Sequence, residues 1–201
     1  NDAPTVSSPA SFALTEDESG NLTYTGTPLA DVDSTNLTVT LTISDGTITG
    51  NAGTGITVGG SATARTFAGT VSDLNTYFTT AGKITYQGAL NNTESRTLTT
   101  QVSDGLLNAT TTSTLNFTAV NDAPTGTDKT ITINEDGSKS FTAEDFGFAD
   151  ANDNPVNAFT AVIITTLPTA GTLKLNSTDV LQNASIPVAD LGNLVYTPAA
   201  D

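Results

Sequence analysis

The feature that most constrains this chain is a five-residue segment that occurs twice. Residues 1–5, Asn-Asp-Ala-Pro-Thr, recur letter for letter at 121–125, and an offset of 120 residues is far too long for a low-complexity period. Acidic residues follow both copies at similar distances, with Glu16 and Asp17 after the first copy and Glu135 and Asp136 after the second. This duplication predicts two modules of one kind, each opened by the same linker.

The spacing of the linkers sets the expected domain boundaries. We expect a first domain at 1–120, which is long enough to bury a core of its own, and a second domain at 121–201. The second domain is shorter, and its last strand-like segment is followed only by Thr-Pro-Ala-Ala-Asp. We therefore interpret it as incomplete at its C-terminus, and the chain as part of a longer protein.

Hydrophobic periodicity indicates strands in both domains. Residues 37–43 alternate strictly between aliphatic residues and threonine, which places one set of side chains on one face of a strand. Similar patterns occur at 97–102, 114–120, 130–133, 158–167 and 171–175. About seven strands in 120 residues, with turns every eight to twelve residues, predict an all-β chain of tandem immunoglobulin-like antiparallel β-sandwiches, the second one truncated.

Helical patterns are short and occupy matching places. Val71, Leu74 and Phe78 have helical spacing after a capping residue, and residues 188–191 lie at the corresponding point of the second domain. Each pattern precedes a strand that ends in tyrosine, at 84–86 and 194–196. This second correspondence supports repetition beyond the linker.

Composition excludes several classes of function. The net charge is −15, from 21 acidic and 6 basic residues, which disfavours nucleic acid and anionic membrane surfaces as partners. Cysteine and histidine are absent, which excludes disulfides, thiolate or imidazole metal sites and Cys/His nucleophiles. No segment has the pattern of a membrane span, so we expect no membrane insertion by this segment.

The acidic residues gather in short loops, and this favours a bound cation. Calcium takes six to eight oxygen ligands, from carboxylates and carbonyls, at flexible geometry. Each acid taken singly is equally well explained as a turn residue, and the total charge as a source of solubility. Asp45 and Asp104, both in Ser-Asp-Gly, are expected to be turn residues. The candidate calcium ligands are Asp2, Glu16, Asp17, Asp31, Asp33, Glu94, Asn121, Asp122, Glu135, Asp136, Asp150, Asn152 and Asp153.

Loop alternation in a sandwich predicts where these residues meet. The loops near Glu16 and Glu94 should lie at the end of the first domain where its last strand enters the linker at Asn121. The loop of Asp150 to Asp153 should lie at the linker end of the second domain. So many carboxylates in one place would repel one another without a cation. We therefore expect calcium to be shared at the junction and to stiffen it.

Several motifs together resemble a known family. The linker Val-Asn-Asp-Ala-Pro at 120–124, the early Glu-Asp pairs, the Ser-Asp-Gly turns and the final Leu-Val-Tyr-Thr-Pro-Ala-Ala-Asp are similar to bacterial cadherin-like tandem repeats of large secreted and RTX-type adhesins. The resemblance covers essentially the whole chain. The first domain departs from it at 86–91, where Tyr-Gln-Gly-Ala-Leu-Asn replaces Tyr-Thr-Pro-Ala-Ala-Asp. The resemblance implies cadherin-like sandwiches with calcium at their junctions and an extracellular or cell-surface location.

We therefore expect a non-catalytic, calcium-binding extender module of a bacterial adhesin, whose partners are the adjacent repeats of the same chain. Two alternatives stay open. One is a module that itself binds a ligand, either a carbohydrate or matrix component of a cell surface or a like module, and the other is an accessory domain of a secreted enzyme. We expect no enzyme activity, because catalytic carboxylate pairs would not recur next to linkers in both domains.

Overall fold

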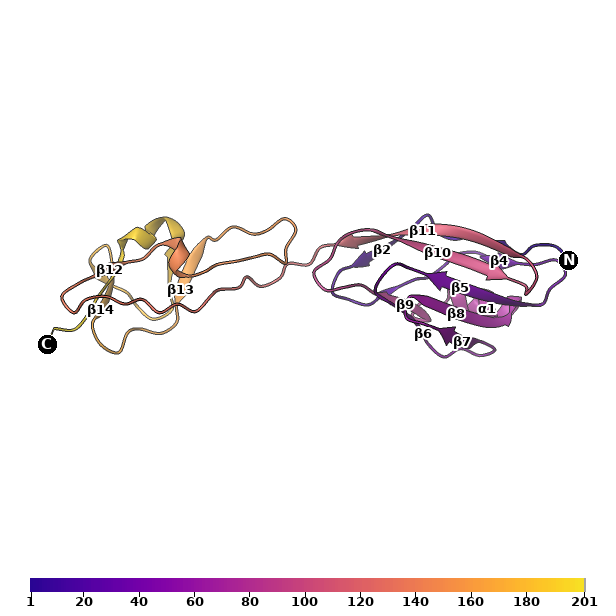
Figure 1. Ribbon diagram of the computed structural model, residues 1–201, viewed down its shortest axis with the longest axis horizontal. Coiled ribbons are helices and arrows are strands. Elements are labelled where there is room, and N and C mark those ends of the chain that lie inside the picture. The colour runs from indigo at the N-terminus through magenta and orange to yellow at the C-terminus, as the bar shows by residue number, and fades with distance from the viewer. Residues whose placement is uncertain (201) are drawn as a thin grey trace. The chain divides into compact units, whose positions relative to one another are not determined.

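The computed structural model describes residues 1–200 and divides the chain into two compact units, here called unit 1 (Asn1–Val120) and unit 2 (Asn121–Asp201). The protein is mostly β, with several antiparallel sheets and little helix (Figure 1). The prediction of a β protein is confirmed at this level. Among the described residues, no helix is long and apolar enough to cross a membrane.

Unit 1 is built from three sheets. A six-stranded sheet has the order β2-β11-β10-β5-β8-β7, a three-stranded sheet the order β3-β9-β6, and β1 pairs with β4. All strand pairs are antiparallel except β11 with β2, which is parallel. The strands are β1 (Thr5–Val6), β2 (Ser11–Thr15), β3 (Gly20–Asn21), β4 (Leu29–Ala30), β5 (Asn36–Thr42), β6 (Thr47–Gly50), β7 (Thr57–Gly60), β8 (Ala64–Thr70), β9 (Ile84–Gln87), β10 (Arg96–Ser103) and β11 (Asn108–Thr118).

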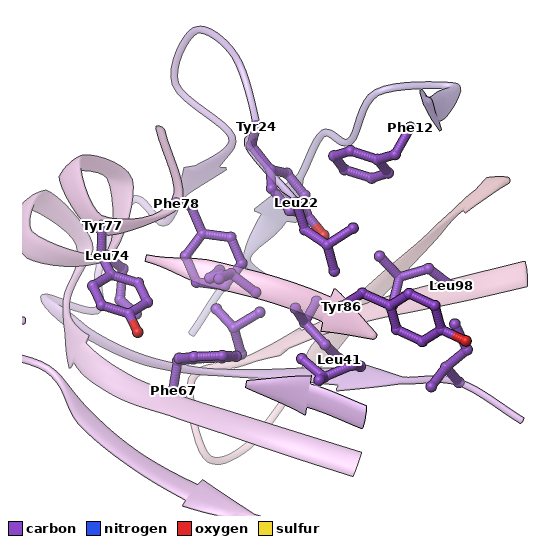
Figure 2. Packing of buried hydrophobic residues seen from close by; sticks show 14 of the residues in the cluster. Phe12, Leu22, Tyr24, Leu41, Phe67, Leu74, Tyr77, Phe78, Tyr86 and Leu98 are labelled. Atoms are coloured by element: carbon purple, nitrogen blue, oxygen red, sulfur yellow. The ribbon is translucent and has the colours of Figure 1, made fainter. Parts of the chain in front are cut away.

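The core of unit 1 follows from the alternation of its strands. In β5 the aliphatic side chains of Leu37, Val39 and Leu41 are buried and the threonines between them are mostly exposed. The three-stranded sheet adds Ile48 to the same hydrophobic cluster, together with Tyr86, which Figure 2 shows among the core residues. Two sheets therefore enclose one core, in which each fully buried aliphatic side chain contributes about 1.5–3 kcal/mol.

The helix expected at 71–78 is confirmed as α1 (Val71–Thr79). Thr70 caps it, because its hydroxyl accepts a hydrogen bond from the Asp73 amide at 3.1 Å. The buried face of α1 carries Leu74, Tyr77 and Phe78, which join the core of unit 1.

Unit 2 has smaller sheets and a smaller core. A four-stranded sheet has the order β12-β17-β14-β15, and β13 pairs with β16. The core cluster contains Val180, Ile186, Leu191 and Leu194, with several aromatic and aliphatic side chains only partly buried around it. The elements are β12 (Lys139–Ser140), the 3₁₀ helix η1 (Ala143–Asp145), β13 (Ala161–Ile164), β14 (Thr172–Leu175), β15 (Thr178–Asp179), β16 (Ala184–Pro187), the 3₁₀ helix η2 (Val188–Asn193) and β17 (Leu194–Thr197).

Strand pairing shows that the two units share a topology. Thr5 pairs with Ala30, and Thr125 forms the corresponding bridge with Ala149. The β3–β9 and β12–β17 pairs correspond, as do β6–β9 and β14–β17. The β5–β8 pair leads into α1, and the β13–β16 pair leads into η2. Unit 2 thus repeats these strand pairings of unit 1, but its described residues contain no counterpart of strand β2.

Three expected strands differ from those observed. The expected strand at 158–167 is shorter, since β13 covers only Ala161–Ile164, and the one at 114–120 belongs to β11, which begins at Asn108. The prediction of a strand at 130–133 is wrong, because these residues do not form a strand. The corresponding segment of unit 1 is β2, which pairs with β11. The described residues of unit 2 contain no counterpart of β11, so the pattern at 130–133 has no partner strand.

Candidate carboxylate sites beside the two linkers

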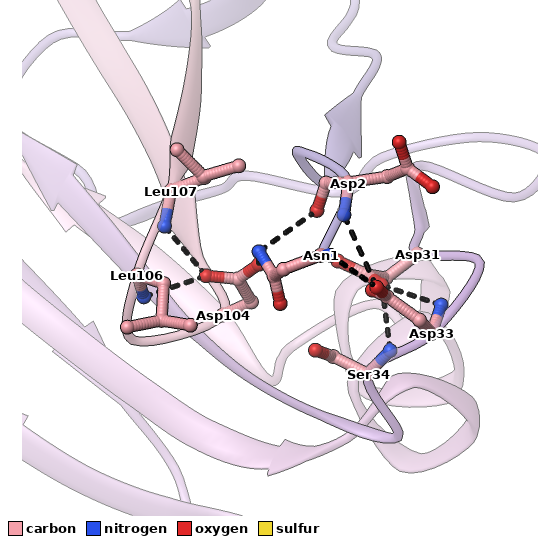
Figure 3. Close-up of polar contacts among 8 residues, drawn as sticks. All are labelled: Asn1, Asp2, Asp31, Asp33, Ser34, Asp104, Leu106 and Leu107. Carbon is pink, nitrogen blue, oxygen red and sulfur yellow. Dashed lines mark hydrogen bonds and ion pairs between the residues drawn. The ribbon is translucent and has the colours of Figure 1, made fainter.

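Three carboxylates of unit 1 meet next to its linker. Asp31 and Asp33 follow β4, and Asp104 lies in the turn between β10 and β11. One carboxylate oxygen from each lies within 4.8 Å of the others. Figure 3 shows Asp33 and Asp104 on either side of Asn1. The fold thus joins residues that are far apart in the sequence.

Backbone amides hold Asp31 in place. Its Oδ1 accepts hydrogen bonds from the amides of Asp33 at 3.0 Å and Ser34 at 2.7 Å. These bonds favour the charged form and keep the pKa of the Asp31 carboxyl below its usual value. The other oxygen, Oδ2, is buried and has no hydrogen-bond partner among the described residues. A buried carboxylate oxygen of this kind requires a ligand or solvent to satisfy it.

Asp104 is fixed by its own turn. Its Oδ1 accepts hydrogen bonds from the amides of Leu106 and Leu107, both at 2.7 Å, and these bonds lower the pKa of the Asp104 carboxyl, with that of Leu107 the larger cause. Its Oδ2 accepts a hydrogen bond from the Asn1 side-chain amide at 2.7 Å. Asp104 is therefore a turn residue, as expected, and also a member of the carboxylate cluster.

The linker of unit 1 contacts the same cluster through its backbone. The amide of Asp2 donates a hydrogen bond to Asp33 Oδ2 at 3.1 Å, and the amino group of Asn1 lies 3.4 Å from the same oxygen. The linker is thereby attached to the loop that follows β4.

Unit 2 repeats this arrangement at its own linker. The amide of Asp122 donates a hydrogen bond to Asp153 Oδ1 at 2.7 Å, with the same separation of 31 residues that joins Asp2 to Asp33. Asp150, 7% exposed, accepts a hydrogen bond from the Asn157 amide at 2.6 Å through Oδ2. Its Oδ1 is buried and has no hydrogen-bond partner among the described residues. Each unit therefore places one unsatisfied carboxylate oxygen at the same point of the repeat.

An asparagine joins the remaining groups of the unit 2 site. The side-chain amide of Asn157 donates to Asn121 Oδ1 at 2.9 Å and also to Asp153 Oδ2. Asn121, Asp122, Asp150 and Asp153, all expected as ligands, are thus connected within one unit. Asn152, expected as a fifth ligand, is exposed in the same loop.

The electrostatics of both sites favour a cation. The ion pairs made by lysine and arginine side chains in the described part of the chain involve Asp45, Asp145 and Asp179. The clustered carboxylates of unit 1 therefore rely on backbone and side-chain amide donors for their compensation. An oxygen-rich, negatively charged and partly open site of this kind has the ligand chemistry that calcium prefers.

A second group of expected ligands meets elsewhere in unit 1. Glu16 is 3% exposed, and its Oε1 accepts a hydrogen bond from the Val120 amide at 2.9 Å. Asp17, with a φ of 62°, accepts one from the Asn91 amide at 2.7 Å. These bonds join the end of β2, the loop after β9 and the end of unit 1. The acidic pair is thereby placed where the loop argument expected it.

The other expected ligands lie outside the two carboxylate sites beside the linkers. The backbone amide of Glu94 donates a hydrogen bond to Asn92 Oδ1 at 2.9 Å, and the Glu94 carbonyl accepts a hydrogen bond from Arg96. Glu135 and Asp136 lie exposed in a turn. The expectation that residues of units 1 and 2 share one cation remains a prediction.

Sequence reasoning missed Asp104 and Asn157 as site residues. Asp104 lies 71 residues from Asp33 and reads locally as a turn, so only its place between β10 and β11 reveals its neighbours. Asn157 carried no signal of its own, since asparagine is common in loops.

Comparison with known proteins gives little further information. No family model and no curated protein matches the chain. Among solved structures, the endo-fucoidan hydrolase MfFcnA4 from glycoside hydrolase family 107 matches with a TM-score of 0.35 and 15% identity, and a variant of it with 0.34 and 16%. Each match covers 98% of this chain but only 24% of the other chain, so this chain spans about a quarter of the structures it matches.

Proposed function

We propose that this chain is a non-catalytic, calcium-binding extender segment of a large bacterial surface or secreted adhesin. It is built from tandem cadherin-like β-sandwich repeats, and calcium bound beside each linker stiffens the succession of units. The location is extracellular or at the cell surface, and the nearest partners are adjacent repeats of the same chain.

One observation carries the proposal. In both units the second residue of the Asn-Asp-Ala-Pro-Thr linker donates its amide to a loop aspartate, and beside it lies a buried carboxylate oxygen without a hydrogen-bond partner in the described chain. These oxygens belong to Asp31 and Asp150. The repetition is difficult to reconcile with ordinary turn residues, because turns require neither a buried nor an unsatisfied oxygen.

The linker attachment explains why a cation here would affect stiffness. In unit 1 the oxygen that holds Asp2, Asp33 Oδ2, belongs to a carboxylate of the cluster. A cation bound by this cluster would neutralise the repulsion between its carboxylates and fix the loop to which the linker is bonded. Cation binding and linker order are thereby coupled through a single side chain.

Small-angle X-ray scattering tests the mechanical part of the proposal. We expect the distribution of maximum dimensions to narrow when calcium replaces EGTA, because loss of the cation releases the linker without opening either core. Asp153→Asn should show the broad distribution in both conditions, whereas Asp128→Asn, an exposed residue of unit 2 with the same change of charge, should behave like the parent. Identical distributions for the parent chain with and without calcium would refute calcium-dependent stiffening.

A further inference from the structure

The six-stranded sheet of unit 1, in which β11, β10, β5 and β8 lie side by side (Figure 1), has one face against the core and one face toward solvent. In β11 the outward residues alternate with more buried ones, and all of them are exposed: Asn108, Thr110, Thr112, Thr114, Asn116 and Thr118. At the outward positions of the other five strands the residues are also threonine, serine, asparagine, glutamine, alanine or glycine. This surface of the described strands, the neutral face, thus has no charged residue and no apolar residue larger than alanine.

The lack of charge on the neutral face contrasts with the rest of the chain, whose net charge is −15. The acidic residues of unit 1 lie in loops, in the linker or in α1. The arginines of the sheet lie on its other face, because Arg65 is in register with Leu41, and Arg96 with Leu115. Unit 1 therefore carries both signs of charge, but neither is on the neutral face.

The neutral face has a depression over β8. Ser103 of β10 lies opposite Thr38 of β5, and Thr38 lies opposite Ala68 of β8. Ala68 in turn lies opposite Thr57 of the edge strand β7. Because alanine has only a methyl group, this row of side chains is lowest at β8, between two threonines. A cavity of about 400 Å³ lies here, a volume typical of small-molecule sites.

The lining of the depression is polar and almost free of charge. The hydroxyls of Thr38, Thr57 and Ser103 and the side-chain amide of Asn36 supply hydrogen-bond donors and acceptors. The one ionisable residue of the lining is Asp104, whose two oxygens already accept hydrogen bonds from amides. The lining contains no basic side chain and no aromatic ring.

These properties select the chemistry of an occupant. An apolar ligand would leave the hydroxyls without hydrogen bonds, which costs free energy. A phosphate, a sulfate or a nucleic acid needs basic partners, and the negative chain repels it. A protein interface depends on aromatic, aliphatic or arginine anchors, and the neutral face contributes none. An uncharged polyol satisfies the hydroxyls and meets no electrostatic repulsion.

The shape of the sheet favours a flexible chain of such groups. Adjacent strands are rotated by about 20–25° relative to one another, so the rows of threonine do not lie in one plane. A rigid crystalline surface would contact only a few rows at a time. A chain of sugar residues can follow the twist from one row to the next.

We propose that the neutral face of unit 1 binds an uncharged polysaccharide, with one sugar residue in the depression over Ala68. Neighbouring sugar residues lie along the threonine rows. The depression belongs to a side of the sheet formed entirely by unit 1, and the proposal goes beyond the extender function and does not rest on calcium.

Affinity electrophoresis of the full chain tests the proposal. Native gels contain dextran, galactomannan or laminarin as uncharged probes, and dextran sulfate as the charged counterpart of dextran. We expect at least one uncharged probe to retard the chain, equally in calcium and in EGTA, and dextran sulfate to leave its mobility unchanged. Because neutral hydrogen bonds replace bonds to water, isothermal calorimetry with the retarding probe should give saturable binding with a dissociation constant of about 10⁻³ M.

Two pairs of variants localise the binding. Ala68→Ile fills the depression and should weaken binding about tenfold or more, whereas Ala13→Ile, the same change at an outward position of β2, should bind like the parent. Replacement of both Thr38 and Thr57 by valine removes two hydroxyls at nearly constant shape and should weaken binding about tenfold. Thr114→Val on β11 is the matched control for this pair and should have no effect.

Three results would overturn the proposal. The first is unchanged mobility with all three uncharged probes, and the second is equal binding by Ala68→Ile and Ala13→Ile. The third is self-association without a probe that Ala68→Ile abolishes, because a second copy of the chain would then occupy the depression. The valine variants keep strand-forming residues, so the test holds even if Ala68→Ile fails to fold. Asp33→Asn should bind the probe like the parent, which separates this result from failure of the calcium experiments.

Discussion

Neutralisation of Asp33 should separate the two roles of the unit 1 carboxylate cluster. In Asp33→Asn the side-chain oxygen that accepts the Asp2 amide is kept, but one of three mutually close negative charges is removed. In EGTA the variant should be as stable as the parent or slightly more stable, because repulsion within the cluster is relieved. In calcium the variant should be the less stable protein, because the site has lost a charged ligand.

The size of the effect follows from mass action. Extracellular calcium sites have dissociation constants of about 10⁻⁴ to 10⁻³ M, so about 5 mM calcium stabilises the folded unit by about 1–2 kcal/mol. The entropy of unfolding is about 2 cal/mol/K per residue, which for unit 1, residues 1–120, converts this to a rise of about 4–8 °C in the melting temperature. Asp33→Asn should lose most of that rise.

Tyrosine fluorescence is a suitable readout of unit 1. Three of the four tyrosines, Tyr24, Tyr77 and Tyr86, are buried in its core, and the chain has no tryptophan. Glu18→Gln, an exposed residue of unit 1 with the same change of charge, is the matched control and should keep the full calcium response. A calcium response that is equal in the parent and in Asp33→Asn would refute the assignment of this cluster.

Two further predictions concern ion pairs away from the linkers. Asp45→Ala should lower the unfolding free energy of unit 1 by about 1–2 kcal/mol, because the buried Arg96 guanidinium, 2.8 Å from Asp45, loses a partner that is half exposed and partly screened by water; an unchanged urea midpoint would contradict this. In unit 2 the pKa of the Asp145 carboxyl lies well below its usual value, mainly because of its hydrogen bond from Lys139. Its contribution to stability is therefore present above about pH 4 and is lost as the pH falls further, so Asp145→Asn should flatten the acid limb of the stability curve, and an equally steep limb would contradict the assignment.

Elements with a strong local pattern could be predicted from sequence. The alternation at 37–43 correctly predicted a strand, because its threonine and aliphatic residues lie on opposite faces. The spacing of Leu74 and Phe78 correctly predicted the helix. The first half of β11, from Asn108 to Ser113, has no aliphatic residue larger than alanine, so its pairing with β10 alone defines it as a strand.

The sequence-based predictions failed where the local structure depends on residues that are distant in the sequence. Residues 130–133 have a strand pattern, but the strand that pairs with the equivalent β2 comes from β11, about a hundred residues further along unit 1. Asp104 likewise joins the carboxylate cluster only because the turn between β10 and β11 brings it there. The residues around Asp104 in the sequence do not indicate this contact. Acidic residues at 31, 33, 150 and 153 were expected as ligands, but the unsatisfied oxygens of Asp31 and Asp150 are defined only by the burial and hydrogen bonding in the structure.

Direct calcium binding tests the central claim, that each unit carries its own linker-proximal site. Isothermal calorimetry on the full chain should detect saturable calcium binding at dissociation constants of about 10⁻⁴ to 10⁻³ M. Asp33→Asn and Asp150→Asn should each abolish part of the heat and together remove most of it. A chain that takes up no calcium, or that binds it unchanged in the double variant, would contradict the account.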